Sequence, residues 1–288
     1  MIIKVPATSA NIGPGFDSIG IAVSLFLTIK VLGPSKTWNI RHSLGSTVPS
    51  DDTNLILSTA LSIVPKLTPH HIEMITDIPM TRGLGSSSSA IVAGIELANQ
   101  LGNLKLSNDE KLQFACTIEG HPDNVAPAIL GNLVIGTNVN GRFSAVKANF
   151  PNFALVACIP SYELKTSESR NVLPRKLEFN IATHASSVSN TFVAALLTGD
   201  YKIMGQMIEL DQFHEPFRQA MVPELKPIRK LGHRCGAIAT YLSGAGPTVM
   251  TIIENKKVDN FISELKKISL SLEQIKIISI VHDGVTVM

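Results

Sequence analysis

The segment Pro79-Met80-Thr81-Arg82-Gly83-Leu84-Gly85-Ser86-Ser87-Ser88-Ser89 leads into residues 90–101, whose apolar side chains recur at helical spacing. Glycines let the backbone approach an anion closely and adopt positive φ angles. The unpaired amides of a first helical turn point at such an anion, and the helix dipole favours negative charge there. The serine hydroxyls add donors and Arg82 adds positive charge. The segment therefore indicates a phosphate-binding loop at the start of a helix.

Two other phosphate motifs do not fit this loop. No Gly-Lys-Ser/Thr follows the glycines, as a P-loop requires. Ser88 stands where the dinucleotide fingerprint has its third glycine. Taken alone, the segment is equally compatible with a tight strand-to-helix turn that binds no ligand.

The composition restricts the class of protein. Hydrophobic residues make up 44% of the 288 residues and charged residues 17%, which predicts a substantial buried core. The net charge of +2, without a basic run, argues against a nucleic-acid partner. The three cysteines, Cys116, Cys158 and Cys235, form no CxxC pair, which indicates a reduced intracellular compartment.

Nothing in the sequence predicts a membrane partner. The longest apolar stretch, residues 19–32, contains Lys30 and is shorter than the roughly 20 residues that span a bilayer. Pro6 and Asn11 interrupt the N-terminal residues before a signal-peptide hydrophobic region can form. We therefore expect a cytoplasmic protein.

The first half of the chain reads as a mixture of strands and helices. After a loop at residues 6–15 we expect strands at 19–31, 38–41 and 72–75, and helices at 51–67, 86–101 and 108–119. Asp51 or Asp52 is the predicted cap of the first of these helices, and Ser107 or Asn108 that of the last. Residues 133–135 and 143–146 form a predicted hairpin across Asn140-Gly141.

The pattern restarts after Pro151. Strands are predicted at residues 153–159, 237–242, 249–253 and 275–281, and helices at 188–197, 223–231 and 258–268. The order strand, helix, strand, strand, helix, strand is that of a split βαβ, or ferredoxin-like, domain with extra helices in its first crossover. We therefore predict two domains, residues 1–150 and residues 151–288.

Three motifs in order resemble those of the GHMP kinase superfamily, which is named for galactokinase, homoserine, mevalonate and phosphomevalonate kinases. They are Pro6-Ala7-Thr8-Ser9-Ala10-Asn11-Ile12-Gly13-Pro14-Gly15-Phe16-Asp17, the segment 79–87, and the glycine turn Ser243-Gly244-Ala245-Gly246-Pro247-Thr248. The resemblance spans nearly the whole chain. It implies an α+β fold, with an N-terminal ribosomal-protein-S5-domain-2-like α/β domain and a ferredoxin-like C-terminal domain.

Within the superfamily, the first motif together with His121-Pro122-Asp123-Asn124-Val125-Ala126-Pro127 resembles the homoserine kinase family. This resemblance implies transfer of the γ-phosphoryl group of ATP to the hydroxyl of L-homoserine, a step of threonine biosynthesis, by a magnesium-dependent homodimer. Two alternatives stay open. One is another kinase of the superfamily, such as a mevalonate-type enzyme, and the other is a homologue that binds nucleotide or metabolite without catalysis.

The resemblance also implies roles for residues of the nucleotide site. ATP is expected to bind the loop that comprises Pro79, Met80, Thr81, Arg82, Gly83, Leu84, Gly85, Ser86, Ser87, Ser88 and Ser89, with Gly244 and Gly246 closing the site. Magnesium prefers hard oxygen ligands, and Glu119 with a hydroxyl of Ser86 or Ser87 is the expected pair. Without the resemblance, Glu119 would be read as a solvated carboxylate at a helix end.

The amino-acid substrate is expected to meet a second set of residues. Asp123 is expected at the reacting hydroxyl, either as a general base or only to orient it; Asn124 is expected to support it, and His121 to contact substrate or form a turn. Asn11 and Asp17 resemble the family's residues for the amino end and hydroxyl, and Arg170 and Arg218 resemble its carboxylate clamp, with Thr166 nearby. Taken alone, both arginines would be read as surface residues.

Overall fold

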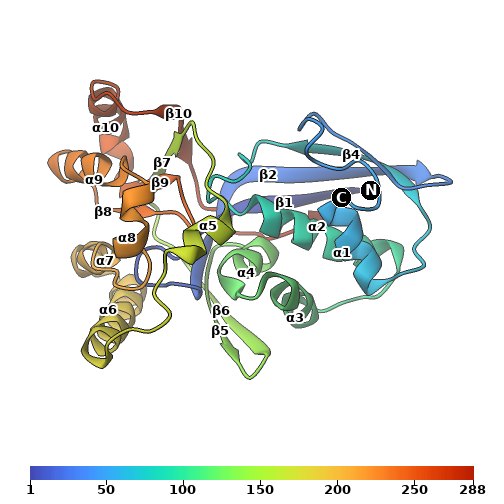
Figure 1. The fold of residues 1–288 in the computed structure, drawn as a ribbon, viewed down its shortest axis with the longest axis horizontal. Coiled ribbons are helices and arrows are strands. Elements are labelled where there is room, and N and C mark those ends of the chain that lie inside the picture. The colour runs from blue at the N-terminus through green and yellow to red at the C-terminus, as the bar shows by residue number, and fades with distance from the viewer.

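The computed structural model describes residues 1–288, which form two sheets side by side (Figure 1). The strands of the seven-stranded sheet are β1 (Ile2–Ala10), β2 (Ile19–Pro34), β3 (Asn39–Arg41), β4 (His70–Thr76), β5 (Leu133–Val139), β6 (Arg142–Ala148) and β11 (Thr286–Val287). Its main path is β11-β1-β2-β4-β3, and the hairpin β5-β6 pairs with the start of β2. Only β3 and β4 pair in parallel.

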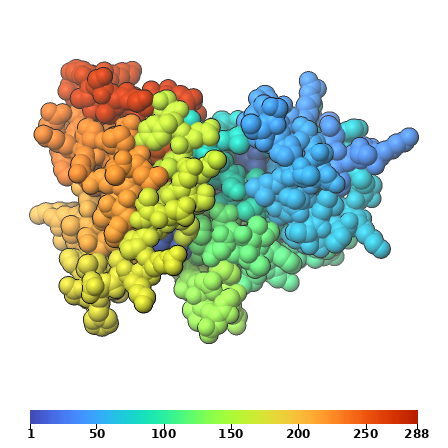
Figure 2. Space-filling model, viewed as in Figure 1, coloured from blue at the N-terminus to red at the C-terminus, as the bar shows by residue number.

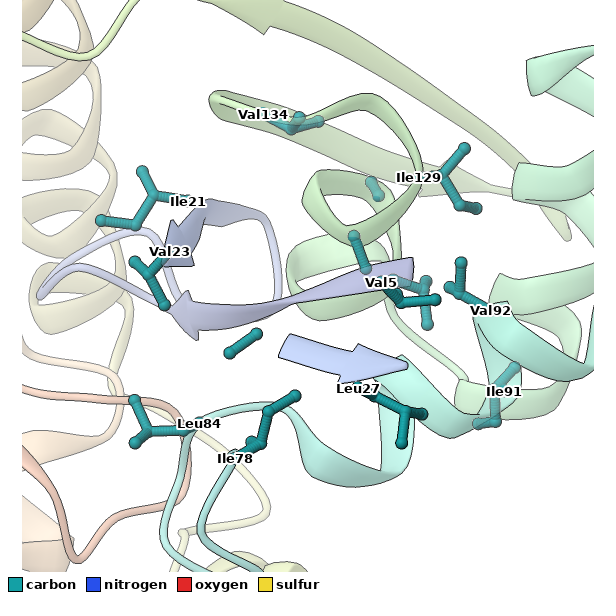
Figure 3. Packing of buried hydrophobic residues seen from close by; sticks show 14 of the residues in the cluster. Val5, Ile21, Val23, Leu27, Ile78, Leu84, Ile91, Val92, Ile129 and Val134 are labelled. Carbon is teal, nitrogen blue, oxygen red and sulfur yellow. The ribbon is translucent and has the colours of Figure 1, made fainter. Parts of the chain in front are cut away.

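Three helices of the first half contact strands of this sheet: α2 (Ser86–Leu101), α3 (Asn108–Glu119) and α4 (Pro122–Leu130). Helix α1 (Leu55–Ile63) packs on α2. Figure 3 shows the resulting core, in which Ile91 and Val92 of α2 and Ile129 of α4 lie with Val5 and Leu27 of the strands. The central helix α2 contacts both β1 and β2. This packing fixes the N-terminus of α2 beside the end of β1.

The four-stranded sheet is antiparallel, in the order β10-β7-β9-β8, and consists of β7 (Ala154–Pro160), β8 (Ala239–Leu242), β9 (Val249–Ile253) and β10 (Leu272–Ile278). Numbered along this half of the chain, the strands lie in the order 4-1-3-2, which is the ferredoxin-like arrangement that the split βαβ pattern predicted. The helices of this half are α5 (Thr166–Asn171), α6 (Phe179–Thr198), α7 (Tyr201–Ile208), α8 (Glu215–Arg218), α9 (Leu225–Arg234) and α10 (Val258–Leu265), with 3₁₀ turns at Gln219–Met221 and Asn255–Lys257.

Alternate residues of β7 belong to two hydrophobic clusters. Leu155 lies in the large core with Phe192 of α6 and Met204 of α7, whereas Val156 lies with Ile228 of α9 and Phe261 of α10. Because successive side chains of a strand point to opposite faces, α6 and α7 cover one face and α9 and α10 the other. None of the helices combines the length and the apolar character that a membrane-spanning helix needs.

The end of the chain returns to the first sheet. Val285 donates a backbone hydrogen bond to Ala128 of α4, and β11 pairs with β1. All other strands of the seven-stranded sheet precede residue 150, and the four-stranded sheet follows it. A domain boundary near residue 150 stays a prediction.

The elements with strong local signals were predicted correctly. Helix α3 begins at its Ser107–Glu110 capping box, and the β5–β6 turn has positive φ at both Asn140 (53°) and Gly141 (79°), as a two-residue hairpin turn of type I′ requires. The strand β2 and the helix α2 also lie where they were expected.

Other boundaries were wrong. Strand β1 continues to Ala10, so much of the expected loop 6–15 is strand. Helix α1 is capped by Asn54 and begins at Leu55, because the Asp51 carboxylate instead accepts hydrogen bonds from the amide and hydroxyl of Thr53. Helix α6 begins at Phe179 rather than 188, and β10 ends at Ile278. Helices α4, α5, α7 and α8 were not predicted.

Candidate active site

A pocket lies where the two halves of the molecule meet, and Figure 2 shows a hollow between the α5 region (yellow) and the α4 region (green). Nineteen residues line the pocket. Those predicted from the sequence are Asn11, Asp17, Thr81, Gly83, Gly85, Ser86, Ser87, Ser88, Glu119, His121, Asp123, Asn124, Thr166, Arg170, Arg218 and Gly244. The three additional lining residues are Phe16, Leu164 and Ala245.

One end of the pocket is the N-terminus of α2. Gly85 is the N-cap in left-handed conformation (φ 69°), and no side chain caps the first-turn amides. A Cβ atom on Gly85 would lie 2.1 Å from the Thr8 hydroxyl, so only glycine fits there. Uncapped amides at a helix N-terminus bind anions. This end of the pocket is therefore suited to phosphate.

The glycine turn at residues 243–248 braces the loop from the other half of the molecule. The Ser243 hydroxyl donates to the Gly83 carbonyl at 2.7 Å, and the Thr248 hydroxyl donates to the Arg82 carbonyl at 2.5 Å. A Cβ atom on Gly83 would lie 2.3 Å from the Ser243 carbonyl oxygen. Gly246 contributes to this close contact but does not line the pocket.

Several loop residues face away from the pocket. Leu84 is buried in the core, and the Ser89 hydroxyl donates to the Pro6 carbonyl at 3.0 Å. The Arg82 guanidinium donates to the carbonyls of Pro160 and Ser161, so its charge ties the loop to β7. Pro79 lines neither this pocket nor its neighbour.

A second, mainly apolar pocket adjoins the first and was not predicted from the sequence. It shares Thr81, Ser86 and Ser87 with the first pocket, and its apolar walls include Leu27, Leu44, Val48, Ile56, Met74, Ile78 and Met80. The Thr81 hydroxyl is buried without a hydrogen-bond partner, and its backbone has φ 52°. Positive φ is uncommon for a β-branched residue, and such strain clusters at functional sites.

Glu119, at the end of α3, meets the phosphate loop through Ser88. The Ser88 hydroxyl donates to Glu119 Oε1 at 3.0 Å, a contact that was not predicted from the sequence. Burial raises the pKa of Glu119, although the charge of His121 and the Ser88 hydrogen bond oppose this effect. Two oxygen atoms, Ser88 Oγ and Glu119 Oε1, therefore lie together at the first turn of α2. Magnesium prefers hard oxygen ligands of this kind.

Asp123 lies in the first turn of α4 and is almost fully buried. His121 Nδ1 and, at 3.3 Å, Asn124 Nδ2 both contact its Oδ1. Burial disfavours the charged imidazole, but the hydrogen bond to Asp123 and its charge raise the pKa of His121 overall. Asn124 also accepts from the Thr8 hydroxyl at 2.7 Å. These contacts leave Oδ2 of Asp123 without a protein partner.

The opposite end of the pocket carries charges of both signs. Arg170, on α5, donates to Asp17 through Nη1 at 3.1 Å and Nη2 at 2.6 Å. Burial opposes the charge of Arg170, but the hydrogen bonds and charge of Asp17 raise the pKa of Arg170 overall. Asn11 connects the segment that carries Asp17 to the glycine turn at residues 243–248. Its side chain accepts a hydrogen bond from the Asp17 amide and donates one to the Gly244 carbonyl, both at 3.1 Å.

Arg218 is the largest side chain that is fully buried. Its Nε donates to the Ser169 carbonyl at 3.1 Å and its Nη1 to the Gly244 carbonyl at 3.0 Å. Phe16 lies beneath both arginines, 5.4 Å from the Arg218 guanidinium and 5.7 Å from that of Arg170. Burial, followed by the like charge of Arg170, lowers the pKa of Arg218 to about 10. Arg218 therefore stays cationic at neutral pH.

The phosphate end, the acidic side chains at its border and the two-domain fold define a small-molecule kinase of the GHMP type. Residues 54–132 match the model of the GHMP kinases N terminal domain, and residues 192–269 match that of the GHMP kinases C terminal domain.

Curated relatives narrow the class further. The chain is 62% identical to homoserine kinase of Limosilactobacillus fermentum over 254 residues, 88% of each chain. It is 55% identical over 287 residues to homoserine kinase of Streptococcus thermophilus, with 100% of both chains covered. A candidate homoserine kinase structure from Listeria monocytogenes has a TM-score of 0.88 at 43% identity, covering 99% of this chain and 98% of that one. The chain belongs to the homoserine kinase family.

Proposed function

We propose that this chain transfers the γ-phosphoryl group of ATP to the side-chain hydroxyl of L-homoserine, giving ADP and O-phospho-L-homoserine. The observation that carries the proposal is that one pocket has an uncapped helix N-terminus at one end and an acid–arginine pair at the other. A zwitterionic amino acid with a terminal hydroxyl matches this distribution of charge, and its hydroxyl extends toward the phosphate end.

The Asp17–Arg170 ion pair provides a way to recognise both charges of the substrate. In the structure the two side chains form an ion pair, so each charge is neutralised by the other. The substrate carboxylate takes the place of Asp17 on the planar guanidinium fork, which suits bidentate recognition. Asp17 is then available to the substrate ammonium. Because a ligand with a carboxylate but no ammonium leaves Asp17 unpaired, the site discriminates against it.

We assign Asp123 to the reacting hydroxyl. Both of its protein hydrogen bonds are made by Oδ1, so Oδ2 is available to accept from the alcohol. His121 Nδ1 and Asn124 Nδ2 both hold Oδ1, which fixes the carboxylate in one orientation. Orienting the hydroxyl for in-line attack is therefore the main role that we propose for Asp123.

We also propose that Glu119 and Ser88 hold a magnesium ion, with Ser86 as the further loop hydroxyl expected from the resemblance. Burial raises the pKa of Glu119 because it disfavours the charged carboxylate. A cation beside this carboxylate would favour the charged form. When held by these residues, the ion would supply positive charge to the phosphate oxygens during transfer. The protein's own contribution is to place the loop amides of α2 around those oxygens.

The neighbouring apolar pocket is our proposed site for the nucleotide base. Thr81, Ser86 and Ser87 line both pockets, so a nucleotide whose phosphates lie at α2 has its base in an apolar cavity, as is common for small-molecule sites. The buried Thr81 hydroxyl, which has no partner in the protein, lies at this junction together with Ser86 and Ser87.

A substrate panel tests the proposed function. We would measure ADP release with magnesium and ATP against L-homoserine, D-homoserine, L-serine, L-threonine and mevalonate. The proposal predicts strong preference for L-homoserine. Mevalonate has no ammonium for Asp17, and preferred turnover of mevalonate would favour the mevalonate-type alternative. Nucleotide binding without turnover of any alcohol would favour the non-catalytic alternative.

The homodimer and the cytoplasmic location implied by the resemblance remain proposals. The support is the family to which the chain belongs. Light scattering on the purified protein measures the oligomeric state directly, and a monomer at micromolar concentration would contradict the first of them.

A further inference from the structure

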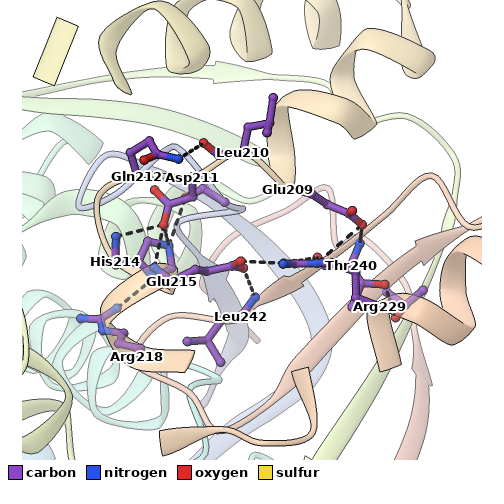
Figure 4. Close-up of polar contacts among 12 residues, drawn as sticks. Glu209, Leu210, Asp211, Gln212, His214, Glu215, Arg218, Arg229, Thr240 and Leu242 are labelled. Carbon is purple, nitrogen blue, oxygen red and sulfur yellow. Dashed lines mark hydrogen bonds and ion pairs between the residues drawn. The ribbon is translucent and has the colours of Figure 1, made fainter. Parts of the chain in front are cut away.

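His214 is fully buried, and it contacts Arg218, which lines the substrate end of the pocket (Figure 4). It precedes α8, the short helix that carries Arg218. Its Nδ1 lies 3.3 Å from Arg218 Nη1, and its Nε2 lies 3.0 Å from the Gly13 carbonyl oxygen. The histidine thus contacts both the arginine and the loop that leads to Asp17.

The two contacts fix the form of the imidazole. A carbonyl oxygen only accepts hydrogen bonds, so Nε2 carries a hydrogen and donates it to Gly13. A guanidinium only donates, so Nδ1 is unprotonated and accepts from Arg218. A neutral imidazole with its hydrogen on Nε2 satisfies both contacts at once.

Asp211 keeps His214 in place. Its Oδ2 accepts from the backbone amides of His214 at 2.9 Å and Glu215 at 2.7 Å, which fixes the start of α8. The same oxygen is 3.5 Å from His214 Nε2, farther than the Gly13 carbonyl. Phe16 stacks on the imidazole with centroids 5.5 Å apart. The ring therefore has little freedom to rotate.

The hydrogen bonds of Arg218 show how His214 orients the guanidinium. A guanidinium has five N–H donors in a fixed plane. The Nε donor is used by Ser169, and those of Nη1 by Gly244 and His214. Only the Nη2 donors lack protein partners, and Arg218 lines the pocket. His214 Nδ1 is thus the third acceptor that holds the Arg218 guanidinium in place and leaves its Nη2 group free for a ligand.

We propose that His214 is a positioning residue that orients Arg218 for the substrate carboxylate and couples it to the loop of Gly13 and Asp17. The inference rests on the proposed function, because it assigns Arg218 to a carboxylate. His214 is not a catalytic residue in this proposal, because it does not line the pocket.

Two variants separate the contacts. His214→Gln places a side-chain amide near the Nε2 position and keeps the bond to Gly13, but loses the acceptor for Arg218. His214→Asn places its amide oxygen near Nδ1 and keeps that acceptor. Losing a hydrogen bond to a charged group predicts that the Gln variant raises KM for L-homoserine about tenfold, with a smaller rise for the Asn variant. KM for ATP stays at the wild-type value in both.

Three controls distinguish positioning from general destabilisation. The exposed His184→Gln on α6 should match wild type. With 3-aminopropan-1-ol, which lacks the carboxylate, His214→Gln and wild type should have equal kcat/KM. In an Arg218→Met background, His214→Gln should add no further loss, because coupled residues are not additive. Thermal unfolding by circular dichroism checks that each variant is folded.

The outcomes are distinct. Equal KM for L-homoserine in wild type and His214→Gln would overturn the positioning role, and so would full additivity with Arg218→Met or an equal loss with the carboxylate-free alcohol. A wild-type protein that does not phosphorylate L-homoserine at all would instead overturn the proposed function, and the inference with it.

Discussion

The phosphate end of the pocket is made from one continuous segment, whereas its amino-acid end is assembled from segments far apart in the chain. Gly83, Gly85 and the serines at the start of α2 lie within seven consecutive residues, 83–89. Asp17 and Arg170 are 153 positions apart, and Arg218 comes from a further helix. The first end relies on backbone amides and the second on charged side chains.

This difference determines how each end fails. A backbone site depends on φ angles and close approach, so a single added methyl group disrupts it together with everything packed against it. A side-chain site loses one charge at a time, and the fold survives. Mutations at the two ends should therefore differ both in size and in which substrate they affect.

The largest effect is expected from Gly85→Ala. The added Cβ atom would lie 2.1 Å from the Thr8 hydroxyl, which holds Asn124 next to Asp123, and alanine at φ 69° is strained. Displacement of the loop by about 1 Å predicts a fall in kcat of about 10²-fold or more. Steady-state kinetics in both substrates measures it.

Gly141→Ala is the matched control for this change. Gly141 also has positive φ (79°), but nothing lies within 4 Å of its Cβ position. The control should lose some stability and keep wild-type kinetics. Equal kinetics for both alanine variants would show that the close packing of Gly85 has no part in phosphate binding.

A smaller and more selective effect is expected from Arg170→Met. Losing a bidentate, charge-assisted contact predicts a fall of about 10²-fold in kcat/KM for L-homoserine, with KM for ATP unchanged. The exposed Arg175→Met on the same segment is the control and should match wild type. If KM for ATP rises as much as KM for L-homoserine, the two ends of the pocket are not independent.

The smallest effect is expected from Thr81→Val. Valine keeps the shape and β-branching of threonine at φ 52° and removes only the unpartnered hydroxyl. Losing one neutral hydrogen bond to nucleotide predicts a rise of about two- to tenfold in KM for ATP. Thr81→Ser, which keeps the hydroxyl, should lie closer to wild type. A Val variant with wild-type KM for ATP would contradict the contact.

Local signals made much of the fold predictable. The Ser107–Glu110 capping box, the Asn140-Gly141 turn and the split βαβ order each depend on residues near one another in sequence. Helix α4 was missed because Pro127 lies inside it, and proline normally ends a helix. Tertiary packing on β1 and β2 supports α4 instead, and the pairing of β11 with β1 is likewise a long-range contact.

The same division holds for the site. The phosphate loop could be proposed from its residues alone, but Arg170 and Arg218 were recognisable only through the family resemblance. Phe16 lies inside the first motif, which was a signal that could have found it. The apolar pocket and the Ser88–Glu119 contact carry no local pattern, because packing of separate segments creates them.

The most direct test of the account is the selectivity between L-homoserine and 4-hydroxybutyrate, which shares the hydroxyl and carboxylate but lacks the ammonium. We would measure kcat/KM for both alcohols in wild type and Asp17→Asn. Wild type should prefer L-homoserine by about 10²-fold, because a charge left unpaired in the pocket is costly, and Asp17→Asn should remove most of this preference. Equal turnover of both alcohols by wild type, or an unchanged preference in Asp17→Asn, would contradict the account.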